Sequence, residues 1–378
     1  MPGGRLKTRQ DIEDFVRGCV FYGTGGGGLP ESGVKTLADA LGAGRKIGWV
    51  DCAGVPDDAL VASAFLNGTI SPPTPEESEE LAALGLSRVV HGESGMLQQA
   101  LSELSGFLGR KIAALVPPEI GAANGPGPLA LGATAGLPVV DGDYAGRSVP
   151  EVRNTTFCMS GKSLFPLACV DRFGNTTILK SGASLGALER LAKLLAVSSC
   201  GLAGQASFVL TGREMKETLI PGTLTMCFTL GRFIRESQKR RVDVPRLITE
   251  YLEGWILIEG VVRSREEKKT AGSLSGTISV TGGAKELRIW YRNESHLAWL
   301  DGRPAAMSPD LISVVKRGSG EPTIHARLAP GDEVAVIGVR AHERLRTPAG
   351  IESLGPKHWG FDLEYAPIED LAKKAPYR

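Results

Sequence analysis

Short apolar segments that alternate with amphipathic segments of helical length dominate the first half of this 378-residue chain. Residues 9–22 and 94–109 place apolar side chains at helical spacing, whereas 59–65 and 111–116 are short apolar runs bounded by turn residues. The same alternation continues with predicted helices at 31–42 and 124–136 and predicted strands at 46–51 and 137–140. Strand–helix alternation is typical of an α/β layer. We therefore expect an α/β N-terminal domain with a largely parallel sheet.

The pattern changes near residue 180. After a predicted helix at 184–197 and two more helical segments, the chain from Trp255 onward consists of short strands separated by turns, at the regular spacing of a β-sandwich or barrel-like module. The predicted strands are 255–263, 272–280, 285–292, 296–303, 310–317 and 332–340. We therefore expect residues 1–180 to form the α/β domain that holds the active site. Residues 181–378 are expected to form a few helices and then a mostly β C-terminal domain.

Charge and composition exclude several classes of protein. The 43 Lys and Arg residues against 42 Asp and Glu leave a net charge of +1, which argues against a polybasic nucleic-acid surface. No apolar run reaches the roughly 18 residues of a membrane span, and the N-terminus lacks the apolar core of a secretory signal. Six scattered cysteines without a CxxC pair predict reduced thiols in the cytoplasm. The balanced charge and an exposed edge in the β-rich half fit a homo-oligomer.

Glycine is frequent, with 49 residues, and it gathers in loops at 23–28, 121–128 and 141–147. Glycine at such density indicates tight turns or close approach of the backbone to a ligand. The first loop contains the spacing GxGxxG, but a dinucleotide site needs a strand directly before the loop, and 9–22 is predicted to be a helix. A substrate-lining loop, a structural turn and a dinucleotide loop are the three interpretations. The residues concerned are Thr24, Gly25, Gly26, Gly27 and Gly28.

Polar side chains follow two of the predicted strands. Glu119 and Asn124 come after one strand, and Asp141 and Asp143 come after another. Open α/β sheets place their ligand crevice at this edge, where neighbouring carboxylates can hold a cation or divide the roles of acid and base. The alternative is that Asp141 and Asp143 are turn residues that accept hydrogen bonds from nearby backbone.

Four further side chains of the first half are candidates. Arg147 and Glu151 could bind an anionic or carbonyl-bearing substrate. His91 is a candidate catalytic residue or metal ligand, with an exposed loop position as the alternative. Cys158 is either a nucleophile or an inert buried thiol. The four histidines of the β-rich half are interpreted as structural or exposed.

Several long stretches together carry a family resemblance. These are DIEDFVRGCVFYGTGGGG near the start, LVPPEIGAANGPGPLALGATAGLPVVDGDYAGRSVPE in the middle, and RNESHLAWLDGRPAAMSPDLISV, LAPGDEVAVIGV and LRTPAGIESLGPKHWGFD toward the C-terminus. Their order and spacing match over about residues 10–365. In these stretches the chain resembles the S-methyl-thiohydantoin desulfurase family, formerly a domain of unknown function and associated with hydantoinase/oxoprolinase-type enzymes.

The resemblance implies an α/β N-terminal domain, a mostly β C-terminal domain and a hydrolase. The implied reaction is the hydrolytic desulfurisation of an S-methyl-thiohydantoin to a hydantoin and methanethiol, with a divalent metal such as Zn as a candidate cofactor. An accessory or ligand-binding subunit of a hydantoinase-type enzyme is a second interpretation, with that enzyme as the partner. A nucleotide-dependent oxidoreductase that uses the GTGGGG loop is the third.

The resemblance also implies roles for the candidate residues. Asp141 or Asp143 would be the base or a metal ligand, with Glu119 as the second carboxylate and His91 as a further candidate ligand. The remaining roles would fall to Asn124 and the amides of Gly25–Gly27 as donors and to Arg147 as the substrate anchor. Val149 stands where the family pattern has an aromatic residue, which predicts a reshaped pocket.

Overall fold

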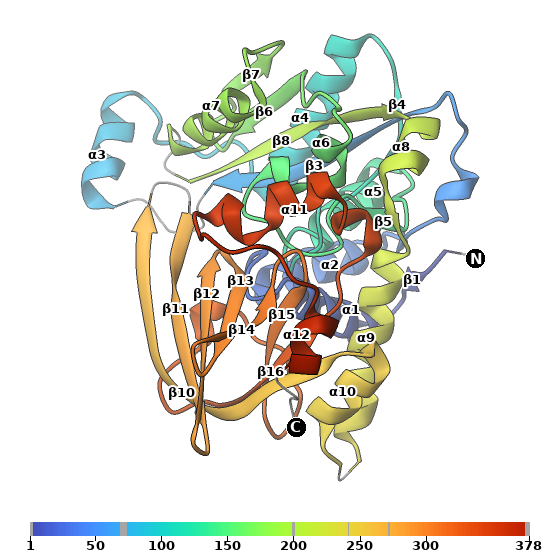
Figure 1. The fold of residues 1–378 in the computed structure, drawn as a ribbon. Helices are drawn as coiled ribbons and strands as arrows, with labels where there is room; N and C mark the ends of the chain where they lie inside the picture. Colours follow the sequence, from blue (N-terminus) through green and yellow to red (C-terminus); the bar gives the residue numbers. More distant parts are fainter. Residues whose placement is uncertain (1–2, 69–73, 199–200, 241, 271–272, 375–378) are drawn as a thin grey trace.

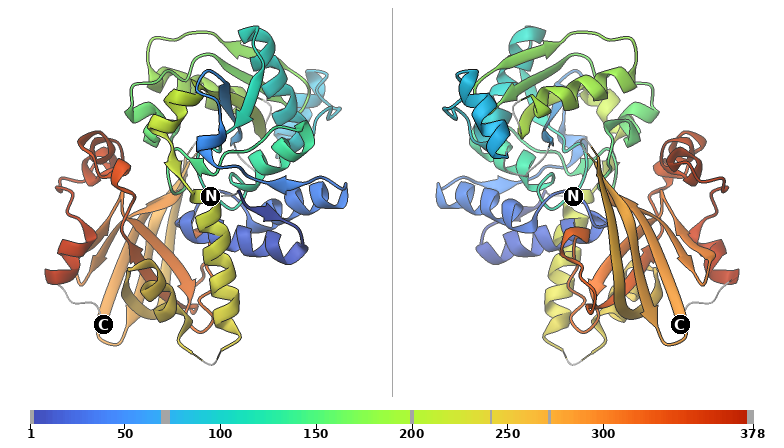
Figure 2. Two further views of the ribbon diagram at one scale, coloured as in Figure 1. Left: turned by 90° about the vertical axis from the view of Figure 1, so that its right-hand side faces the viewer. Right: turned by 90° about the vertical axis from the view of Figure 1, so that its left-hand side faces the viewer.

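The computed structural model describes residues 3–68, 74–198, 201–240, 242–270 and 273–374. An α/β layer lies above a curved antiparallel sheet, and the helices α1 (Arg9–Tyr22) and α9 (Thr223–Gln238) pack together beneath the first and beside the second (Figure 1, Figure 2). The expected two-part architecture, α/β and then mostly β, is confirmed in this arrangement.

The sheet of the α/β layer has five strands in the order β4 (Ile112–Leu115), β3 (Leu60–Gly68), β8 (Leu202–Thr211), β6 (Leu167–Asp171) and β7 (Thr176–Leu179). Among the described pairings, β3 and β4 are parallel, and the other three pairs are antiparallel. The sheet is therefore mixed, instead of largely parallel as the sequence predicted. The reason is that β6 and β7 form a hairpin and β8 returns antiparallel to the centre of the sheet. None of these three strands was predicted from the sequence.

Two helices cover the two faces of this sheet. α4 (Glu93–Leu108) packs on the face that carries Ala62 and Ala206, whereas α7 (Leu185–Val197) packs on the face that carries Val61 and Ala203. Adjacent residues of one strand thus point to opposite helices, as the period of a strand requires. Because β8 follows residue 180, the sheet combines strands from both sides of the predicted domain boundary.

The second sheet has seven antiparallel strands and curves into a half-barrel (Figure 1). Its order is β14 (Arg303–Met307), β13 (Glu294–Leu300), β12 (Lys285–Arg292), β11 (Ser273–Gly282), β10 (Trp255–Thr270), β16 (Glu333–Val339) and β15 (Leu311–Lys316). Six of these strands coincide with the predicted ones. β14 is the additional strand, and it pairs with β13 at the edge of the sheet.

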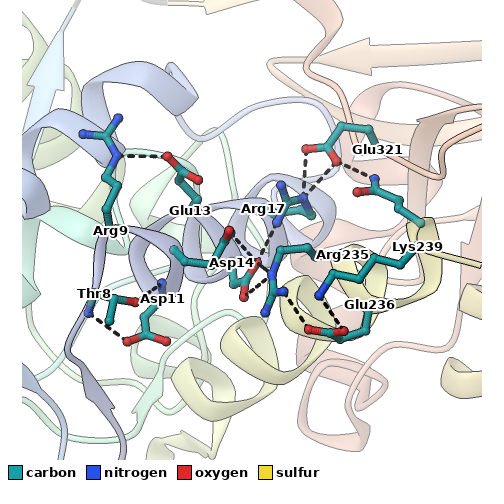
Figure 3. A network of polar contacts seen from close by, with 12 residues as sticks. Thr8, Arg9, Asp11, Glu13, Asp14, Arg17, Arg235, Glu236, Lys239 and Glu321 are labelled. Atoms are coloured by element: carbon teal, nitrogen blue, oxygen red, sulfur yellow. Dashed lines mark hydrogen bonds and ion pairs between the residues drawn. The ribbon is translucent and has the colours of Figure 1, made fainter.

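An ionic network around the buried Asp14 joins α1 and α9 to the second sheet (Figure 3). α1 has the bounds that the sequence predicted and begins at a capping box on Thr8. The carboxylate of Asp14, 1% exposed, accepts hydrogen bonds from Arg17 and from Arg235 of α9, both at 2.8 Å. Arg17 also donates to Glu321, which lies between β15 and β16, at 2.9 Å. These ion pairs fix the helix pair against the sheet.

The remaining elements are short. The helices are α2 (Pro30–Gly42), α3 (Pro75–Ala83), α5 (Pro126–Ala135), α6 (Thr156–Met159), α8 (Gly212–Thr218), α10 (Val244–Leu252), α11 (Pro348–Leu354) and α12 (Ile368–Lys374). The strands are β1 (Arg5–Leu6), β2 (Ile47–Gly48), β5 (Gly142–Asp143) and β9 (Ile220–Pro221). Within the described ranges, no helix combines the length and apolar character needed to cross a membrane.

Candidate active site

The glycine-rich loop at 23–28 directly follows α1, so a helix and not a strand precedes it. A dinucleotide-binding loop connects a strand to the N-terminus of a helix, where the pyrophosphate binds. That arrangement is absent from this loop. The structure leaves the other two interpretations, a loop that lines a site and a structural turn.

Backbone hydrogen bonds hold this loop between the two halves of the molecule. The carbonyl oxygen of Gly27 accepts from Ala123 N at 2.9 Å, on the side of the α/β layer. The carbonyl oxygen of Thr24 accepts from Ser295 N at 2.9 Å, on the side of the curved sheet. The loop therefore lies where the segments after β4 and at the start of β13 meet.

At two positions of the loop the backbone lies so close to buried side chains that only glycine fits. Gly25 has φ +98°, and a Cβ there would lie 2.1 Å from His325 Nε2. A Cβ on Gly26 would lie 2.0 Å from Glu294 Oε1. Any side chain at these positions would displace His325 or Glu294, so the glycines let the backbone pass directly over them.

Two buried glutamates lie beside the loop. Ser148 Oγ donates to Glu294 Oε1 at 2.9 Å, while Glu294 Oε2 is buried without a hydrogen-bond partner among the described residues. Glu119 Oε2 accepts from Val149 N at 2.6 Å, and Glu119 Oε1 accepts from the amide of Asn124. Glu119 is 8% exposed and Glu294 is 2% exposed. Segment 148–149 thus donates hydrogen bonds to both carboxyl groups.

Burial changes the acidity of both groups. It raises the pKa of Glu119 to about 7, although the hydrogen bonds from Val149 and Asn124 favour the ionised form. Burial, and then the charge of Glu119, raise the pKa of Glu294 to about 8. Two interacting acids of this kind titrate as a pair, and near neutral pH one carboxyl is ionised while the other keeps its proton. The pair can therefore both accept and donate a proton.

Arg147 is fully buried and uses all of its donors within the protein. A guanidinium group has five N–H bonds, and the structure gives this side chain five hydrogen bonds of 2.8 to 3.4 Å. The acceptors are the carbonyl oxygens of Ser148, Ser295, Pro309 and Asp310 and the hydroxyl of Thr24. The side chain that the sequence predicted as a substrate anchor thus ties the glycine-rich loop to both halves of the chain.

Asp141 and Asp143 bond to backbone N–H groups. Asp141 Oδ1 accepts from Leu224 N and Thr225 N at 3.0 Å, which caps α9 in place of a side chain at Gly222. Asp143 Oδ2 accepts from the N–H groups of the second and third residues after it, at 2.9 and 2.8 Å. Burial raises the pKa of Asp143 to about 7. Asp143 thus has the geometry of the turn alternative, whereas Asp141 caps a helix that is distant in the sequence, which neither interpretation predicted.

The predicted metal ligands do not come together. The backbone N–H of His91 donates to the carbonyl oxygen of Arg172 at 3.0 Å, so His91 lies beside the β6–β7 turn, whereas Asp141 caps α9. In the part of the chain that the structure describes, no three His, Cys, Asp or Glu side chains are placed to hold a metal ion. The set Asp141, Asp143 and His91 therefore does not fit a metal site.

Glu151 is surrounded by two arginines and a histidine. Its carboxylate pairs with Arg292 Nη2 at 3.1 Å, with Arg153 Nε, and with His358 Nε2 at 3.4 Å. Burial alone would raise its pKa, but the hydrogen bonds from His358 and Arg153 outweigh burial and lower the pKa to about 2. Glu151 is thus ionised, and its ion pair with Arg292 links the segment that carries Ser148 to the end of β12.

Both halves of the chain match known family models. Residues 10–181 match the N-terminal domain and residues 183–368 match the C-terminal domain of a family described as S-Me-THD-like. The chain belongs to the S-Me-THD-like family. The resemblance found in the sequence is thereby confirmed.

One solved structure shows the same fold as this S-Me-THD-like chain. It is the crystal structure of a protein from Chromobacterium violaceum, similar with a TM-score of 0.77 at 22% identity over 97% of this chain and 100% of that chain. No curated protein matches the chain.

Part of the candidate site of this S-Me-THD-like protein was not predicted from the sequence. Glu294, Ser148 and His325 were not candidates, yet they lie against the glycine-rich loop or the carboxyl pair. His325 Nε2 lies 2.9 Å from Ser295 Oγ, and burial lowers the pKa of His325 to about 4, so the ring is neutral. The available signal was the stretch RNESH, which carried the family resemblance and contains Glu294.

The cysteines behave as buried or partly buried thiols. Cys158 Sγ donates to the carbonyl oxygen of Val152 at 3.3 Å, and burial raises the pKa of this thiol to about 12, which fits the inert interpretation. The free cysteines described are Cys19, Cys52, Cys158, Cys169 and Cys227. Cys200 lies outside the described residues.

Proposed function

We propose that this S-Me-THD-like protein is a hydrolase that converts an S-methyl-thiohydantoin to a hydantoin and methanethiol. The observation that carries the proposal is the buried pair of Glu119 and Glu294, both of which accept hydrogen bonds from segment 148–149 beside the glycine-rich loop. Hydrolysis of such a ring needs a base for water and an acid for the ring nitrogen. A carboxylate and a carboxylic acid in one site supply both.

The two carboxyl groups balance the reaction in two steps. In the first, ionised Glu119 takes a proton from water as the oxygen bonds to the ring carbon that carries the methylthio group, and protonated Glu294 gives its proton to the ring nitrogen. In the second, ionised Glu294 takes the proton of the new hydroxyl as the carbonyl forms and the C–S bond breaks. Glu119 then protonates the departing methanethiolate. Both carboxyl groups return to their starting states.

The glycine-rich loop offers donors for the substrate. Within the described residues, the N–H groups of Gly27 and Gly28 donate to no protein acceptor, and both residues are at least partly exposed. Free backbone N–H groups of this kind can stabilise charge that develops on the ring. Asn124 is a positioning residue in this proposal, because its amide holds Glu119.

The direct test is release of thiol from a synthetic S-methyl-thiohydantoin by the purified protein, followed with a thiol reagent and by chromatography of the hydantoin. We expect methanethiol and hydantoin in equal amounts. A matched control is Glu250→Gln, which changes an exposed glutamate of α10 and should keep wild-type turnover.

Absence of thiol release from the wild-type protein, with and without added divalent metal, would contradict the proposal. If the inactive protein also co-purified tightly with a hydantoinase-type enzyme, the accessory-subunit interpretation would be favoured instead.

A further inference from the structure

A surface pocket of about 520 Å³ has Glu151 in its lining, but neither Glu119 nor Glu294. It is formed by α7 together with Glu151 and Arg153. Arg190 and Lys193 contribute cationic groups from α7, and Leu194 and Val197 contribute apolar side chains from the same helix.

The acids of the pocket already have partners. Glu151 pairs with Arg292 and His358, which lie outside the pocket lining, and Glu189 Oε1 pairs with Lys193 Nζ at 3.1 Å. The positive charges of the pocket are therefore only partly neutralised from within.

Two guanidinium groups have N–H donors that form no hydrogen bond with the described residues. Arg153 binds Glu151 through Nε, and its two Nη groups form no hydrogen bond with any described residue. Arg190 is exposed and forms neither a hydrogen bond nor an ion pair within the described ranges. Paired guanidinium N–H groups match the two oxygens of a carboxylate.

Next to these donors lies an apolar wall. Leu194 is 52% exposed and Val197 is 50% exposed, one turn apart on α7. We propose that the pocket binds a small amphipathic carboxylate, with the carboxylate between Arg153 and Arg190 and a short apolar chain along Leu194 and Val197. This inference does not depend on the desulfurase reaction.

Isothermal titration calorimetry on the full-length protein tests the proposal, with hexanoate as the probe. Hexanoate is expected to bind at one site per chain, and acetate at least about tenfold more weakly, because four methylenes of apolar contact are lost. Hexanol, which lacks the charge, should give no binding heat. Inorganic phosphate should bind more weakly than hexanoate, because it has no chain for the apolar wall.

The variant Arg190→Ala is expected to weaken hexanoate binding about tenfold or more, since a charge-assisted contact is removed. Arg190 has no hydrogen-bond or ion-pair partner within the described residues, so the variant should unfold at the same thermal midpoint as the wild type. The matched control is Arg246→Ala, an exposed arginine of α10, which should bind hexanoate as the wild type does.

Three results would overturn the proposal: no heat from hexanoate at millimolar concentration, equal affinity for hexanoate and phosphate, or unchanged binding in Arg190→Ala. Because calorimetry needs no turnover, failure here and failure of the proposed hydrolase are separate outcomes.

Discussion

Glu294 and Glu151 are buried to a similar degree, 2% and 5% exposed. Glu294 contacts Ser148, and Glu151 lies three residues after Ser148 in the chain. Glu294 receives a hydroxyl from Ser148 at one oxygen and has no described partner at the other, and its pKa is about 8. Glu151 has Arg153, Arg292 and His358 around it, and its pKa is about 2. Burial alone therefore does not decide what a carboxyl group does. The contacts with Arg153, Arg292 and His358 outweigh burial at Glu151 and keep it ionised, whereas the charge of Arg147 does not outweigh burial at Glu294, whose pKa stays raised.

The comparison is tested most strongly by removing the reactive carboxyls. Glu119→Gln and Glu294→Gln should each lower the rate of methanethiol release by about 10²- to 10⁴-fold, because each variant lacks a group that accepts a proton in one step of the reaction and donates a proton in the other. Initial rates at saturating substrate measure the effect, and circular dichroism reports whether the fold is kept. Retention of more than a tenth of the wild-type rate in both variants would remove the pair from the mechanism.

The structural side of the comparison is tested at Glu151. Glu151→Gln should lower the free energy of unfolding by about 2 kcal/mol at pH 7, since hydrogen bonds to a charged group are lost at a buried site. Urea unfolding measures this change. The exposed change Glu250→Gln should cost less than about 0.5 kcal/mol. Equal costs for the two variants would show that the cations around Glu151 do not stabilise the fold.

The raised pKa of Glu294 predicts how the stability of the fold depends on pH. Because the pKa of Glu294 is raised to about 8, the folded state holds more protons than the unfolded state above about pH 4.5, and stability falls as the pH rises toward 8. Replacing Glu294 by Gln should flatten this fall by about 1 kcal/mol per pH unit. Urea unfolding at pH 5, 6.5 and 8 measures it, with Glu250→Gln parallel to the wild type. A variant Glu294→Gln that also runs parallel to the wild type would contradict the raised pKa.

Asp141 provides the smallest expected effect. Asp141→Ala removes the cap of α9 and should lower the free energy of unfolding by about 1 kcal/mol, with turnover close to that of the wild type. Urea unfolding measures the change in stability, and the initial rate of methanethiol release measures the turnover. A loss of 10²-fold or more in rate with unchanged stability would instead support the prediction from the sequence that Asp141 is a base or a metal ligand.

Part of the site followed from local sequence. Glu119, Asn124 and the glycine-rich loop were candidates because glycines and polar residues after a strand mark ligand-facing turns, and the structure brings these segments together. Glu294 was not predicted, because it lies in a short polar stretch between two predicted strands, 285–292 and 296–303, where a solvent-exposed turn is the ordinary interpretation. Its contact with Ser148 joins residues 146 positions apart. No local spacing encodes such a contact.

The sequence by itself determined the helix α1, six of the seven strands of the curved sheet and the family. These depend on periods of 3.6 and 2 residues and on long matching stretches, which are properties of the chain alone. Only the tertiary structure placed β8 at the centre of the first sheet, assigned Asp141 to the end of α9 and surrounded Glu151 with cations. The physical reason is that strand pairing, desolvation and ion pairing depend on which distant segments pack together. The pKa values of Glu119 and Glu294 are raised only once the two side chains are buried near each other.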